Sequence, residues 1–204
     1  MQGVNAVVLV PVKAFSDAKA RLAAVLGDAE RERLARWTAA RVLAAAGELP
    51  TYVACDDEQV AAWAGEHGAA ILWHPGVGLN AAVNNSVADL RAAGVTDVIV
   101  AHGDLPRAHS LASLTEPGAI TFVPDRHGDG TNVIALPTDL QFRFAYGPGS
   151  FLRHLDAAIA AGHSVRVCRD PLLAADIDTP ADLAHPLVQE VLPSWLQTNQ
   201  ANPR

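Results

Sequence analysis

Short apolar runs alternate with helix-patterned segments along the first half of this chain, and this alternation limits the fold more than any other feature. The first run, Val4–Val10, is broken only by Asn5, and similar runs follow at Thr51–Ala54, Ala69–Trp73 and Asp97–Ala101. The nearly continuous first run suits a strand buried on both faces. We therefore predict four strands here.

Helical patterns separate these runs. They lie at residues 29–47, from Asp56-Asp57 to about His67, and from about Asn80 to Ala93. Gly68 and Gly94 follow the second and third of them as stop signals. Strands that alternate with helices imply right-handed crossovers. The pattern predicts an α/β fold with a mostly parallel central sheet and helices on both faces.

The second half of the chain is less regular. It predicts strands at Ile120–Val123, Asn132–Leu136 and Val165–Cys168, and a helix at Pro148–Ala161. We see no repeat or interdomain linker, so residues 1–204 are expected to form a single domain. From about residue 187 the chain is rich in Pro, Asn and Gln, and this tail, 187–204, is expected to fray.

Bulk properties exclude several classes of protein. The net charge of −7 argues against nucleic-acid binding, which needs a basic surface. No apolar run approaches the roughly 18 residues of a membrane span, and the first residues lack the basic region of a secretion signal. Cys55 and Cys168 lie far apart, without metal-ligand spacing. We expect a cytoplasmic protein with free thiols.

The loop after the first strand gathers cations in an otherwise acidic chain. Of 15 basic residues only Lys13 and Lys19 are lysines, and Arg21 lies beside them. The loop has neither the P-loop motif nor the glycine fingerprint of dinucleotide-binding folds. Three cations can offset the charge that gathers on a leaving pyrophosphate. The competing interpretation is a solvated surface cluster, but ligands bind at this end of the strands in open α/β sheets.

Three carboxylates are candidate ligands for a hard metal ion. Asp104 follows the apolar strand that ends at Ala101, and Asp176 and Asp178 are two residues apart, which places both on one face of an extended segment. Mg²⁺ prefers one or two carboxylates together with substrate phosphates. Structural alternatives stay open: an Asx-turn or helix cap at Asp104, and a cap by Asp178 or Thr179 on a helix that begins at Pro180.

Two glycine-rich segments indicate a second anionic substrate. In Gly128–Asn132 small residues let backbone amides approach an anion, and Gly147–Ser150 precedes a helix N-terminus. Each segment alone is a weak signal.

The ordered set of motifs resembles the 2-phospho-L-lactate guanylyltransferases, which include the phosphoenolpyruvate guanylyltransferases of coenzyme F420 biosynthesis (the CofC-like family). The resemblance covers about residues 5–185. The matching segments are Pro11-Val12-Lys13, Ala18–Leu22, Gly78-Leu79-Asn80, Gly103–Pro106, Pro124-Asp125-Arg126, Gly130-Thr131-Asn132, Gly147–Ser150 and Asp176–Pro180. Two departures are Ala20, where Ser or Thr is expected, and Gly149, where an acidic residue is expected.

The resemblance implies a GT-A-like nucleotidyltransferase fold and Mg²⁺-dependent transfer of GMP from GTP to phosphoenolpyruvate, 2-phospho-L-lactate or 3-phosphoglycerate. Carried over by position, it gives four groups of site residues. These are catalytic Lys13, Lys19, Arg21 and Asp104; nucleotide-binding Pro11, Val12, Lys13, Gly78, Asn80 and Gly103; acid-binding Arg126, Thr131, Gly147 and Ser150; and metal-binding Asp104, Asp176 and Asp178.

Other functions stay open from the residues alone. One is a nucleotidyltransferase with a different acceptor, such as a molybdopterin or a sugar phosphate. Another is a non-catalytic nucleotide-binding module on the same fold. Two protein partners are compatible with the main interpretation: a second copy in a homodimer, and a downstream transferase that receives the unstable product.

Overall fold

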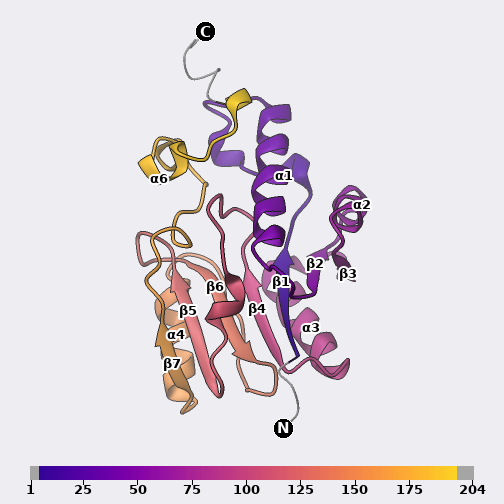
Figure 1. Cartoon of the computed structure of the whole chain (residues 1–204), viewed down its shortest axis with the longest axis vertical. Coiled ribbons are helices and arrows are strands. Elements are labelled where there is room, and N and C mark those ends of the chain that lie inside the picture. Colours follow the sequence, from indigo (N-terminus) through magenta and orange to yellow (C-terminus); the bar gives the residue numbers. More distant parts are fainter. Residues whose placement is uncertain (1–4, 197–204) are drawn as a thin grey trace.

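A computed structural model describes residues 5–196 and contains one seven-stranded sheet in the order β3-β2-β1-β4-β6-β5-β7 (Figure 1). The strands are β1 (Ala6–Pro11), β2 (Thr51–Cys55), β3 (Ala70–Trp73), β4 (Asp97–Ala101), β5 (Ala119–Pro124), β6 (Thr131–Pro137) and β7 (Ser164–Val167). The longer helices are α1 (Asp28–Ala44), α2 (Glu58–Glu66), α3 (Gly78–Ala92) and α4 (Ser150–Ala160). Short helices are η1 (Phe15–Asp17), η2 (Ala20–Leu22), η3 (Leu111–Leu114), α5 (Pro180–Leu183) and α6 (Pro186–Gln189).

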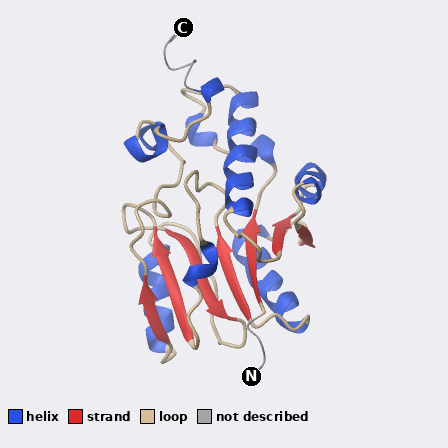
Figure 2. Ribbon diagram, in the orientation of Figure 1, coloured by secondary structure: helices blue, strands red, loops and turns tan. Residues whose placement is uncertain are grey.

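One strand runs against the others. β6 pairs antiparallel with both β4 and β5, while the remaining pairs in the sheet are parallel (Figure 2). The start of β6 therefore lies at the same edge of the sheet as the carboxyl ends of β4 and β5. This edge gathers Gly103 and Asp104 after β4 and Thr131 at the beginning of β6.

The central strands β1 and β4 bury both faces, as the apolar run of β1 predicted, whereas the edge strands β3 and β7 are partly exposed. Along β1, Val8 and Val10 pack with α1 and α2 in one core cluster, whereas Val7 and Leu9 pack with α3 and α4 in the other. The period-two alternation of side chains along a strand accounts for this division. The predicted sheet with helices on both faces is confirmed.

The eleven elements predicted from the sequence are all present, with ends within two or three residues of the predicted ones. The side chain of Asp57 caps α2 by accepting a hydrogen bond from the Val60 amide at 2.9 Å. Gly68 follows α2 with a φ of +77°, in the left-handed region that favours glycine at helix ends. The short helices in the loop after β1, η3 and α6 were not predicted, whereas α5 begins at Pro180, where the sequence offered a helix start.

The fraying expected from about residue 187 is wrong for the described part of that tail. Val188, Leu192 and Leu196 are buried in a third core cluster with Leu22, Leu34 and Ile177. These apolar residues stabilise the segment against the loop after β1 and α1, which lie beside it in Figure 1. The rest of the predicted tail, 197–204, lies outside the described residues. Between residues 5 and 196, no helix is long and apolar enough to cross a membrane.

Candidate active site

The cations of the loop after β1 have different surroundings. Lys13 is exposed and Arg21 is exposed on η2. Lys19 has a left-handed backbone (φ 57°, ψ 34°), and its side chain is only 7% exposed. Its ammonium donates to the Ile177 carbonyl at 2.5 Å. The three predicted cations are therefore not equivalent, and Lys19 is the buried one.

Lys19 meets two of the predicted metal ligands. Its Nζ lies 3.3 Å from Asp104 Oδ2 and 3.3 Å from Asp178 Oδ1. Carboxylate oxygens of Asp104, Asp176 and Asp178 all lie within 4.8 Å of one another. The structure thus brings together side chains that are more than 70 residues apart in the sequence, at the carboxyl edge of β4.

The charges in this cluster shift the ionisation of its members. Burial alone would lower the pKa of Lys19 and raise that of Asp104, but their mutual attraction prevails, so the Lys19 pKa is raised and the Asp104 pKa is lowered. Asp176 lacks such a cation. Burial first, and then the charge of Asp104, raise the pKa of Asp176 to about 7.

The extended segment before α5 explains how Asp176 and Asp178 reach the same place. Ala175 and Ile177 are buried, while Asp176 and Asp178 alternate with them and face the cluster. Thr179, rather than Asp178, caps α5, with its hydroxyl accepting from the Asp182 amide at 3.4 Å. The cap role predicted for one of these two residues belongs to Thr179, which leaves the Asp178 carboxylate in the cluster.

The carboxylate cluster fits a divalent cation. Asp104 Oδ1 is buried and has no hydrogen-bond partner among the described residues, so it is an acceptor that lacks a donor. Oxygen ligands from two or three carboxylates are the donor set that Mg²⁺ takes in phosphate-transfer sites. No helix begins beside Asp104 in the described chain, so the helix-cap alternative is not realised.

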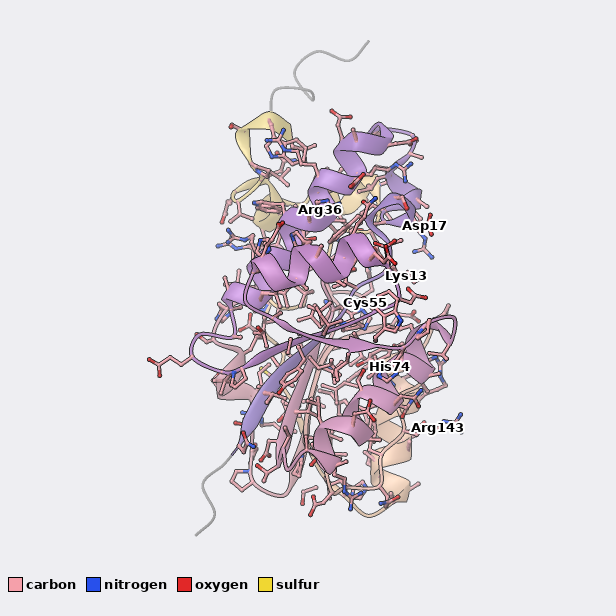
Figure 3. The ribbon with its side chains drawn as sticks, turned by 90° about the vertical axis from the view of Figure 1, so that its right-hand side faces the viewer. Lys13, Asp17, Arg36, Cys55, His74 and Arg143 are labelled. Atoms are coloured by element: carbon pink, nitrogen blue, oxygen red, sulfur yellow. The ribbon has the colours of Figure 1, made fainter. Side chains whose placement is uncertain are left out.

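A cleft of two connected lobes opens beside the cluster. The inner lobe, of about 260 Å³, is lined by Lys13, Lys19, His102, Gly103, Asp104 and Asp178. The outer lobe, of about 210 Å³, is lined by Lys13, Cys55, Asp56, His74 and Gly78. Pro11, Val12, Lys13, Asp17 and Leu79 line both lobes. Figure 3 shows Asp17, Lys13, Cys55 and His74 following one another downward on one side of the molecule.

Asn80, predicted to bind the nucleotide, makes a structural contact instead of lining either lobe. Its amide accepts from the Tyr146 N–H at 2.6 Å and donates to the Tyr146 carbonyl at 3.1 Å. Asn84, one turn later on α3, makes the same pair of bonds with Phe144, both at 3.1 Å. We call these four hydrogen bonds the amide clasp. They fix the segment before Gly147 on α3.

The two glycine-rich segments already have protein anions bound to their amides. The Asp125 carboxylate accepts hydrogen bonds from the amides of His127, Asp129 and Gly130 at 2.8–3.0 Å. The Asp129 carboxylate accepts from the Gly149 amide at 3.0 Å, directly before α4. The predicted anion sites are therefore used to build the loops.

The predicted acid-binding hydroxyls are buried and linked to a histidine. Thr131 Oγ1 lies 3.0 Å from His154 Nδ1 and 3.4 Å from Ser150 Oγ. His154 Nε2 accepts from the Ala145 amide at 2.8 Å, so a neutral ring carries its proton on Nδ1 and donates it to Thr131. Burial lowers the pKa of His154 to about 4, which keeps the ring neutral.

Arg126 and Gly147 lie apart from the two lobes. The Nη1 atom of Arg126 lies 2.5 Å from Asp182 Oδ1. The Arg126 side chain lines a different cavity, together with Arg169 and His185. Gly147 is exposed, with a φ of 128°, between the amide clasp and α4. The structure thus brings together Lys13, Lys19, Gly103, Asp104, Asp176 and Asp178, with Pro11, Val12 and Gly78 in the adjoining cleft. The predicted residues that line neither lobe are Arg21, Asn80, Arg126, Thr131, Gly147 and Ser150. The roles assigned to these residues stay predictions.

Sequence reasoning missed several residues that shape the site. His154 lies on the inner face of the predicted helix, where a histidine reads as a packing residue. Asn80 and Asn84 are four residues apart, and this spacing predicts that both side chains lie on one face of α3. Asp56 was considered only as part of a helix start.

Comparisons with known proteins identify the family of this chain. Residues 6–190 match the model of the family described as "Guanylyl transferase CofC like". A phosphoenolpyruvate guanylyltransferase of Sphaerobacter thermophilus is 36% identical in an alignment of 187 positions that covers 87% of this chain and 90% of that protein. The enzyme of the same name from Rubrobacter xylanophilus is 38% identical over 186 residues, covering 86% of this chain and 90% of the relative.

Solved structures support the fold. A nucleotidyl transferase from Methanothermobacter superposes with a TM-score of 0.62 at 16% identity, covering 89% of this chain and 95% of that one. A CMP:2-keto-3-deoxy-manno-octonic acid synthetase complexed with CTP superposes with a TM-score of 0.59 at 15% identity, covering 91% of this chain and 98% of that one. Together with the match to the family model, this places the chain among the nucleotidyltransferases. The chain belongs to the CofC-like guanylyl transferase family.

Proposed function

We propose that this protein transfers GMP from GTP to a three-carbon phospho-acid, phosphoenolpyruvate or 2-phospho-L-lactate, and releases pyrophosphate. The observation that carries the proposal is the cluster of Asp104, Asp176 and Asp178, two of which pair with Lys19, beside a cleft that Lys13 also lines. The curated relatives with the name phosphoenolpyruvate guanylyltransferase support the choice of reaction. Coenzyme F420 biosynthesis is the pathway that we infer from the family.

The residues of the cleft suit an in-line displacement. A phosphate oxygen of the acid attacks the α-phosphorus of GTP, the new P–O–P bond forms, and the bond to pyrophosphate breaks. The attacking oxygen is already anionic at neutral pH, so no general base is needed. Catalysis then depends on positioning and on neutralising charge.

Each charged group has a place in this scheme. Asp104 and Asp178, with Asp176, would hold Mg²⁺, which when bound supplies charge neutralisation at the α-phosphate. Lys13, which is exposed and lines both lobes, is placed to pair with the departing phosphates. Lys19 favours the ionised form of Asp104 and contacts the carboxylates of both Asp104 and Asp178 at 3.3 Å. We propose that the whole chain acts as one domain.

Pyrophosphate release tests the proposal. GTP should react with phosphoenolpyruvate, 2-phospho-L-lactate or 3-phosphoglycerate in the presence of Mg²⁺, and mass spectrometry should detect the guanylyl diphospho-acid. Asp104→Asn should abolish turnover while GTP still binds. Asp28→Asn is the matched control, because Asp28 is 96% exposed at the start of α1, outside the cleft. The absence of pyrophosphate with all three acids would refute the proposed function.

A further inference from the structure

Two backbone carbonyls at the outer lobe, those of Ala54 and Cys55 at the end of β2, already accept hydrogen bonds from neighbouring backbone amides. The Ala54 carbonyl accepts from the Val12 amide at 3.0 Å, and the Cys55 carbonyl accepts from the His74 amide at 3.1 Å. Side-chain acceptors are therefore the stronger candidates to recognise a ligand that presents N–H donors to this end of β2. Two acidic side chains line the lobe, Asp17 and Asp56.

Asp56 differs from its neighbour Asp57 in what its carboxylate does. Asp57 is committed to the α2 cap through its 2.9 Å bond with the Val60 amide. Asp56 is exposed, lines the outer lobe, and accepts one long hydrogen bond, from the Gly76 amide to Oδ2 at 3.3 Å. Its side chain therefore retains acceptor capacity toward the lobe.

The charges of the cleft indicate which lobe holds the phosphates of a nucleotide and which holds its base. Lys19 and the three carboxylates are at the inner lobe, so the phosphates and their metal belong there. Each lobe is smaller than the roughly 300–1,000 Å³ of a typical site for a whole ligand, so a nucleotide has to use both. The base then occupies the outer lobe, between Leu79 and the ends of β2 and β3.

We propose that Asp56 reads the base and selects guanine. Guanine presents two adjacent donors on its Watson–Crick edge, the N1–H and the 2-amino group, and a carboxylate can accept both at once. Adenine and cytosine present an unprotonated ring nitrogen there, which a carboxylate repels, and uracil presents a single N–H. Asp17 lines both lobes and so lies nearer the phosphate end. This inference rests on the proposed use of a nucleoside triphosphate.

Binding of three triphosphates to the full-length protein tests it. With Mg²⁺ and no acid acceptor, the dissociation constants of GTP, ITP and ATP are measured by calorimetry. ITP lacks only the 2-amino group. The protein should bind GTP about 10- to 100-fold more tightly than ITP, because one hydrogen bond to a charged acceptor is lost, and ATP still more weakly. Asp56→Asn should reduce the GTP-over-ITP preference to within a few-fold.

Asp57→Asn is the matched control. Asn is as good a helix cap as Asp, so this variant should fold and keep the full preference for GTP. If Asp56→Asn does not fold by circular dichroism, Asp56→Glu replaces it; the longer side chain keeps the charge but misplaces the oxygens, and the preference should again fall.

Each result separates the two proposals. Equal binding of GTP and ATP by the unmodified protein, no GTP binding at all, or an unchanged preference in both Asp56 variants would overturn the role of Asp56, even if pyrophosphate is released. An Asp56-dependent preference without pyrophosphate release from any acid would sustain the role of Asp56 and remove the proposed reaction.

Discussion

His154 should make the folded protein less stable as the pH falls. The buried ring has a pKa of about 4, whereas an unfolded histidine has a pKa near 6.5. A depressed pKa means that the unfolded state takes up the proton first, so stability is complete above about pH 6.5 and is lost as the pH falls toward 4. At about pH 5 the unfolded ring is nearly fully protonated and the folded ring is mostly neutral, which corresponds to a loss of about 2 kcal/mol.

Asp176 opposes this effect in the metal-free protein. The Asp176 pKa of about 7 lies above that of an unfolded carboxyl. Its contribution to the stability of the folded state is therefore present at low pH and is lost as the pH rises through about 7. The stability curve of the unmodified protein therefore combines both residues and cannot isolate either. The difference in free energy of unfolding between this protein and a His154 variant isolates the effect of His154, because Asp176 is present in both proteins.

His154→Gln is the variant that suits this comparison. A glutamine amide can accept from the Ala145 amide and donate to Thr131, as the neutral ring does, but it does not titrate. Urea unfolding at about pH 8 and about pH 5 gives the free energy of unfolding of both proteins. Between about pH 8 and about pH 5, the difference in free energy of unfolding between the two proteins should change by about 2 kcal/mol in favour of the variant. An equal difference in free energy of unfolding at both pH values would refute the neutral, buried state of His154.

Three further outcomes follow from the described contacts. Mg²⁺ should raise the melting temperature in thermal-shift measurements, and Asp104→Asn should remove most of that rise, since it deletes a ligand of the cluster; an equal rise in the variant would exclude Asp104 from the metal site. Asn84→Ala should lower the free energy of unfolding by about 1–3 kcal/mol, because two hydrogen bonds to Phe144 are lost, and chemical denaturation measures it. Gly130→Ala should also destabilise, by about 1–3 kcal/mol, because its Cβ would meet Asp125 Oδ2 at 2.8 Å; an unchanged denaturation midpoint would contradict this contact.

The periodic parts of the fold were predictable because each has a local cause. β4 was predicted at its observed bounds, Asp97–Ala101, since a buried strand needs a run of apolar residues. The reversed direction of β6 was not predictable, because it follows from how Thr131–Pro137 pairs across the sheet and not from its own composition. The order at Leu192 and Leu196 likewise comes from a distant partner, Leu34 on α1.

The site was predictable where residue type alone suggests the chemistry. Asp104, Asp176 and Asp178 were recognisable as hard-metal ligands, and the structure does place them together. The burial of Lys19 was not, because it depends on a left-handed turn and on Ile177, more than 150 residues away. The glycine loop was misjudged as open to an anion because the hydrogen bonds of Asp125 to its amides are tertiary details of one turn.

The amide clasp has a kinetic consequence. α3 begins at Gly78, which lines the outer lobe, and Asn80 and Asn84 on the same helix hold the backbone of Tyr146 and Phe144, just before Gly147. A rotation of α3 caused by a ligand at Gly78 would therefore be carried to the segment that leads into α4. Because these hydrogen bonds join the helix at the outer lobe to the segment before α4, we predict that the two substrates bind in a preferred order, which steady-state kinetics can measure.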